Sequence, residues 1–114
     1  MMTYAIIAFA LTAVVGLVMA AKVLSGKQAP WVLSLAHALV GATGLILLGT
    51  TTFNAGWPGQ LTASLGLLVV AALGGFYLAS YHLKGAISPK GIVLVHAGVA
   101  VTGVLVLLSV FFNL

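Results

Sequence analysis

The stretch PWVLSLAHALVGATG at residues 30–44 decides the fold, because its pattern returns as PKGIVLVHAGVAVTG at residues 89–103. In each copy a histidine follows the proline by seven residues and a glycine follows it by fourteen. Most of the remaining positions are apolar, and neither copy contains an acidic residue. An apolar run that begins at a proline predicts a helix with its first turn at that proline. The second copy predicts that the chain uses this helix twice.

The repeat covers both halves of the chain at a constant offset of 59 residues. Besides the prolines and histidines, it aligns Thr43-Gly44 with Thr102-Gly103 and, one helix earlier, Gly16 with Gly75. Val23 stands opposite His82, so the third histidine has no counterpart. Because 59 residues carry the chain through two helices, equivalent helices run in the same direction. We therefore expect one helical hairpin used twice, with a parallel pseudo-two-fold axis along the membrane normal.

The composition places this fold in a lipid bilayer. Of the 114 residues, 63% are hydrophobic and 4% are charged, whereas about a quarter of the residues in a soluble domain are charged. Four apolar runs are long enough to cross a hydrocarbon core of roughly 30 Å as helices. They are residues 4–21, 31–53, 61–83 and 92–112. We expect an all-α integral membrane protein, a four-transmembrane-helix up-down bundle, with one domain (1–114) made of the hairpins 1–55 and 60–114.

The charged side chains predict the orientation of the bundle. All four are lysines, and they lie in or beside the first and third gaps between the spans: Lys22, Lys27, Lys84 and Lys90. The positive-inside rule then places these two loops in the cytoplasm and both termini outside. The expected location is a bacterial inner membrane.

The residues that are missing exclude several kinds of chemistry. The chain has no Asp, Glu or Cys, which removes paired-carboxylate hydrolysis, carboxylate-bound magnesium or calcium, and every thiolate site. Four cations form no basic stripe, so no binding to nucleic acid is expected. The expected partners are the lipid bilayer and either another protein within the membrane or a second copy of this chain.

The histidines are the candidate functional residues, because an ionisable side chain inside a membrane span is costly and is seldom kept without a role. His37 and His96 each lie seven residues after a helix-starting proline, about 10 Å from the start of the helix. At equal depth on helices of the same direction, they are expected to face each other across the bundle axis. Gly41, Gly44 and Gly103 keep large side chains away from the faces that carry these two imidazoles.

Two facing imidazoles and small neighbours match the needs of haem b, whose iron takes one axial nitrogen from each side. In outline the chain resembles the small membrane b-type cytochromes, in which histidines on different helices clamp a haem. The resemblance implies an electron-transfer protein rather than a stand-alone catalyst. His37 and His96 would be the iron ligands, Gly41, Gly44 and Gly103 would make room for the ring, and His82 would be a supporting residue.

Two alternatives to haem remain open. His37, His96 and His82 could hold another metal ion such as copper, nickel or zinc, although no carboxylate or thiolate would neutralise its charge. Alternatively, each imidazole donates its N–H to a carbonyl or hydroxyl group of a neighbouring helix, with Ser34 and Thr43 as candidate partners. In that case no cofactor is bound, and the protein is a non-catalytic accessory or assembly subunit of a larger membrane complex.

Overall fold

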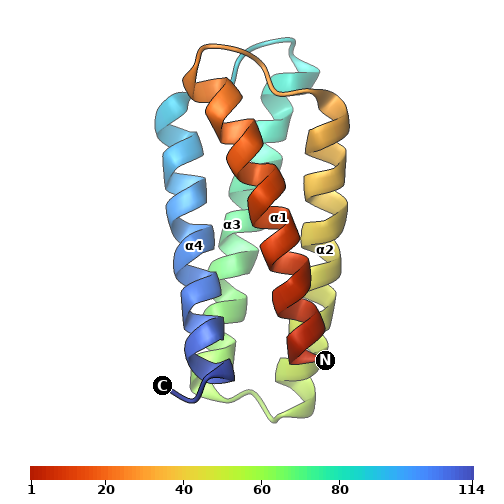
Figure 1. The fold of residues 1–114 in the computed structure, drawn as a ribbon, viewed down its shortest axis with the longest axis vertical. Helices are drawn as coiled ribbons and strands as arrows, with labels where there is room; N and C mark the ends of the chain where they lie inside the picture. Colours follow the sequence, from red (N-terminus) through yellow and green to blue (C-terminus); the bar gives the residue numbers. More distant parts are fainter.

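The computed structural model describes all 114 residues and contains four α-helices and no strand. They are α1 (Met2–Leu24), α2 (Trp31–Asn54), α3 (Gly59–Leu83) and α4 (Lys90–Phe111). Each helix is long and apolar enough to cross a membrane. They run alternately up and down in a bundle 43 × 21 × 19 Å in extent, with both termini at one end (Figure 1). The expected four-transmembrane-helix bundle is confirmed.

Prolines and glycines define the helix boundaries. Pro30, Pro58 and Pro89 directly precede α2, α3 and α4, and the carbonyl of each accepts the first backbone hydrogen bond of its helix. At the other end of α1 and α3 the chain turns at Gly26 (φ +81°) and Gly85 (φ +69°), in the left-handed region that a side chain disfavours. The helices extend beyond most of the expected spans; α1, for example, runs one turn past residue 21 and includes Lys22. The long lysine stem allows this, because its ammonium can reach the membrane surface.

The hairpins are the packing units of the bundle. Helix α1 packs along α2, and α3 packs along α4, more extensively than either hairpin packs on the other. Helices α2 and α3, and likewise α1 and α4, meet along two sparser seams between the hairpins. The backbones of α1 and α3, and those of α2 and α4, stay apart across the axis. Helices related by the 59-residue offset therefore lie diagonally opposite, as a pseudo-two-fold axis along the bundle requires.

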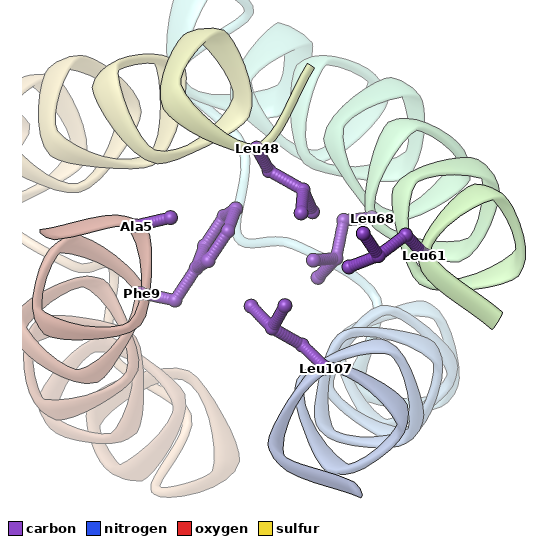
Figure 2. Packing of buried hydrophobic residues seen from close by; sticks show 6 residues of the cluster. All are labelled: Ala5, Phe9, Leu48, Leu61, Leu68 and Leu107. Atoms are coloured by element: carbon purple, nitrogen blue, oxygen red, sulfur yellow. The ribbon is translucent and has the colours of Figure 1, made fainter. Parts of the chain in front are cut away.

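The end of the bundle that holds the termini is filled by an apolar core. Side chains from all four helices point into it: Ala5, Phe9, Leu48, Leu61, Leu68 and Leu107 (Figure 2). Leu48 and Leu107, which are 59 residues apart, are both fully buried. Gly44 lies under the ring of Phe9, and Gly103 lies under Leu68, the residue that the offset pairs with Phe9. The sequence repeat is therefore also a repeat of contacts.

Large apolar side chains cover the outside of the bundle. Ile46 and Leu73, near the middle of α2 and α3, are 70% and 62% exposed, respectively. Such a surface is suited to lipid and unsuited to water. It is consistent with the expected contact with a bilayer.

Candidate functional site

The two histidines of the repeat meet at the axis of the bundle, about a quarter of the way along α2 and α4 from the lysine-bearing end. His37 comes from α2 and His96 from α4, on opposite sides of the axis. Their ring centroids are 6.1 Å apart, and the ring planes make an angle of 68°. The expectation that these imidazoles face each other is confirmed.

Each of these imidazoles is held by the neighbouring helix of its own hairpin. Nδ1–H of His37 donates to the carbonyl oxygen of Thr12 at 2.9 Å, and Nδ1–H of His96 donates to that of Ala71 at 2.7 Å. Thr12 and Ala71 are again 59 residues apart. A carbonyl oxygen can only accept, so Nδ1 carries the proton, and in the neutral ring Nε2 keeps a free lone pair.

Two glycines bring the imidazoles within reach of these carbonyls. Gly16 and Gly75 lie four residues after Thr12 and Ala71, where a side chain would cover the carbonyl oxygen. A Cβ atom at Gly16 would lie 2.9 Å from Cε1 of His37, and one at Gly75 would lie 3.2 Å from Cε1 of His96. The imidazoles therefore occupy the space that the missing side chains leave.

A cavity of about 410 Å³ surrounds the histidine pair. Its wall is mostly apolar and is built near the rings from small residues that the repeat matches in pairs: Ala13 and Ala72, Gly16 and Gly75, Gly41 and Ala100. Nε2 of His37 and Nε2 of His96 have no hydrogen-bond partner in the protein. Every side-chain nitrogen or oxygen that is fully enclosed does have a partner, so these two nitrogens are not fully enclosed. Both Nε2 lone pairs are therefore accessible from the cavity.

The three glycines expected beside a cofactor are in two different environments. Gly41 lines the cavity and faces the methyl group of Thr12. Gly44 and Gly103 lie deeper, against Phe9 and Leu68, and are not part of the cavity wall. The small residues in direct contact with the imidazoles are Gly16 and Gly75, which the repeat aligned without indicating what they touch.

The hydroxyl groups considered as partners of the central imidazoles bind elsewhere. The hydroxyl of Thr43 donates to the carbonyl of Leu39 on its own helix, and Oγ of Ser34 lies 3.5 Å from Nε2 of His82. Neither forms a hydrogen bond with His37 or His96. Backbone carbonyls are the partners instead.

His82 forms a separate polar site at the end of the bundle that carries the lysines. Its Nε2–H donates to the carbonyl oxygen of Ala29 at 2.6 Å, and its ring centroid is 5.2 Å from that of Trp31. No group of three or more His, Cys, Asp or Glu side chains is placed to hold a metal ion. The three histidines thus form a pair and a single residue, which disfavours the three-histidine metal site.

Comparison of the chain with known protein families, curated proteins and solved structures finds no match in any of the three.

The close contact at Gly16 generates the first testable prediction. Gly16→Ala forces the ring of His37 away from the Thr12 carbonyl, and we expect the free energy of unfolding in detergent to fall by about 1–3 kcal/mol. Gly66→Ala is the matched control, because nothing lies within 4 Å of a Cβ there, and it should be neutral or stabilising by up to about 1 kcal/mol. Equal effects of the two substitutions on unfolding by denaturant would contradict the contact.

Proposed function

We propose that the protein binds one b-type haem between His37 and His96 and transfers electrons within the membrane. The observation that carries the proposal is the pair of imidazoles 6.1 Å apart, each held at Nδ1 by a carbonyl and open at Nε2 to one apolar cavity. A histidine that binds a metal commonly donates its other ring N–H to a carbonyl in this way.

The separation of the imidazoles supports a single metal atom between them. If each Nε2 bound the same metal atom, the distance between ring centroids would be the sum of two metal–nitrogen bonds of about 2 Å and the two distances from Nε2 to its ring centroid, which is roughly 6 Å. The observed 6.1 Å agrees with this sum.

Charge favours haem over a bare metal ion. The chain offers no Asp, Glu or Cys to neutralise a divalent cation, and an unneutralised charge in a low-dielectric site is very costly. A porphyrin ring supplies its own two negative charges to the iron. The volume of about 410 Å³ also lies within the range of cofactor pockets, roughly 300–1,000 Å³.

The residues of the site would each have a defined task. Bound here, haem would supply one-electron oxidation and reduction at its iron. The carbonyls of Thr12 and Ala71 fix the direction of the imidazoles through Nδ1 and make Nε2 a better electron donor. Gly16 and Gly75 keep the rings close to these carbonyls. The apolar wall excludes water, which is one of the factors that set a haem's reduction potential.

A visible absorption spectrum tests this proposal. Protein produced with a haem precursor and purified in detergent should show a Soret band, with sharp α and β bands after reduction by dithionite. His37→Ala and His96→Ala each remove one of the two nitrogens that would bind the iron, and each should abolish the reduced α and β bands or the bound haem itself.

Thr43→Ala, on the same helix and about 9 Å further along its axis than His37, provides a control, because that hydroxyl bonds only to its own helix. It should leave the spectrum unchanged. A colourless wild-type protein, obtained in full yield with the precursor supplied, would rule out the haem proposal.

A second candidate function follows from the same hydrogen bonds. The bonds from His37 and His96 join the two helices of each hairpin without any cofactor, so they could serve packing alone in an accessory or assembly subunit. The loops at residues 25–30, 55–58 and 84–89 are short. A protein partner, or a second copy of the chain, would therefore bind in the plane of the membrane. The colourless outcome above would favour this function.

We also propose that the lysine-bearing loops face the cytoplasm of a bacterial cell and that both termini lie outside the inner membrane. Loops 25–30 and 84–89 lie together at the end opposite the termini (Figure 1), and all four lysines lie in or near them. Alkaline phosphatase fused after Leu114 should be active, and the same enzyme fused after Lys27 should be inactive. The reverse pattern would contradict this orientation.

A further inference from the structure

The two halves of the bundle differ in polarity at several matched positions, and three of these positions line the central cavity near the lysine-bearing end. Three polar residues of the lysine-bearing end have apolar counterparts at the 59-residue offset: His82 corresponds to Val23, Ser34 to Val93, and Ser88 to Ala29. Val23, Ala29 and Val93 form a buried apolar cluster. The repeat therefore places polar residues at the three positions that match this apolar cluster.

Because of this difference in polarity, the two seams between the hairpins have different contacts at matched positions. At the α2·α3 seam, Oγ of Ser34 lies 3.5 Å from Nε2 of His82. At the α1·α4 seam the equivalent contact joins Val93 and Val23. At this pair of matched positions, the α2·α3 seam offers hydrogen-bonding groups and the α1·α4 seam offers methyl groups.

The cavity around the central histidines has the same asymmetry along its length. Ser34, His82 and Ser88 line its end near the lysines, whereas Phe9, Leu45, Leu68 and Val104 line its opposite end. A molecule that fills this cavity meets polar groups at one end only. The cavity therefore suits an amphipathic ligand.

His82 also borders the exterior of the bundle. A surface pocket lies beside it, lined by Gln28, Ala29, Pro30, Trp31, His82 and Leu83. Ala29 and His82 line both spaces, so their hydrogen bond separates the central cavity from this pocket. All the lysines of the chain lie toward this end, and no acidic side chain exists to pair with them. A negative group at the α2·α3 seam would find uncompensated positive charge.

We propose that the α2·α3 seam at His82 and Ser34 binds the anionic edge of the ligand, the two propionate groups of haem. This inference rests on the proposed function and adds the direction in which the haem lies in its cavity. The Ser34 hydroxyl can donate to a carboxylate, and the Nε2–H group of His82, which bonds to Ala29 and lies 3.5 Å from the Ser34 oxygen, is a second donor at the same seam. His37 lies six residues after the first residue of α2, about 9 Å along the axis, so an edge of a ring bound at His37 would lie near this seam.

Binding of two porphyrins tests the inference. Iron protoporphyrin IX and its dimethyl ester have the same ring and iron, but the ester lacks the two negative charges. Titrated into wild-type protein in an uncharged detergent and followed at the Soret band, the free acid should bind at least about tenfold more tightly than the ester. His82→Val should reduce this preference about tenfold without removing the bis-imidazole spectrum.

The repeat supplies both the substitutions and their control. His82→Val and Ser34→Val each introduce the residue that the other seam already contains, so the fold accommodates them, and Ser34→Val should weaken the preference in the same direction. Val23→Ala, at the same depth of the α1·α4 seam, should leave it intact. If neither porphyrin binds to the wild type, the proposed function and this inference both fail. If both porphyrins bind equally, or if His82→Val and Ser34→Val keep the full preference, only this inference fails.

Discussion

The hydrogen bond from each central imidazole to a carbonyl of the adjacent helix is the contact on which the site depends. In lipid an unpaired N–H group costs several kcal/mol, because no water is present to replace its partner. The carbonyls of Thr12 and Ala71 satisfy Nδ1–H, and they are reachable because Gly16 and Gly75 leave them uncovered. Fixing the proton on Nδ1 fixes the lone pair on Nε2. A packing contact thereby sets the chemistry of the opposite nitrogen.

Duplication turns this one contact into a pair of facing imidazoles. A single hairpin holds one imidazole against its own neighbouring helix and presents it on one face. Two hairpins packed with parallel pseudo-two-fold symmetry place both imidazoles at one depth, with ring centroids 6.1 Å apart. The same symmetry places small residues in matched positions on the cavity wall. His82 and Ser34 depart from this symmetry, and they make one end of the cavity more polar than the other.

Much of the fold could be predicted from the sequence. The prolines indicate where helices begin, the apolar runs indicate which segments span the membrane, and the constant offset indicates the repeat of the hairpin. The facing of His37 and His96 followed from that offset alone. Their hydrogen-bond partners, the carbonyls of Thr12 and Ala71, could not be predicted, because every residue has a backbone carbonyl and the residue type does not show which one is used. The matched glycines at positions 16 and 75 were the available signal. Gly44 and Gly103 share a helix face with the histidines, but spacing along one helix does not tell which neighbour that face meets, and both lie against the core instead.

The central claim is that both imidazoles bind the same iron atom, and pulsed electron paramagnetic resonance of the ferric protein labelled with ¹⁵N-histidine tests it most directly. Two histidine nitrogens with similar couplings to one low-spin iron are the result the account predicts. Coupling to a single histidine nitrogen, or a high-spin signal, would contradict it.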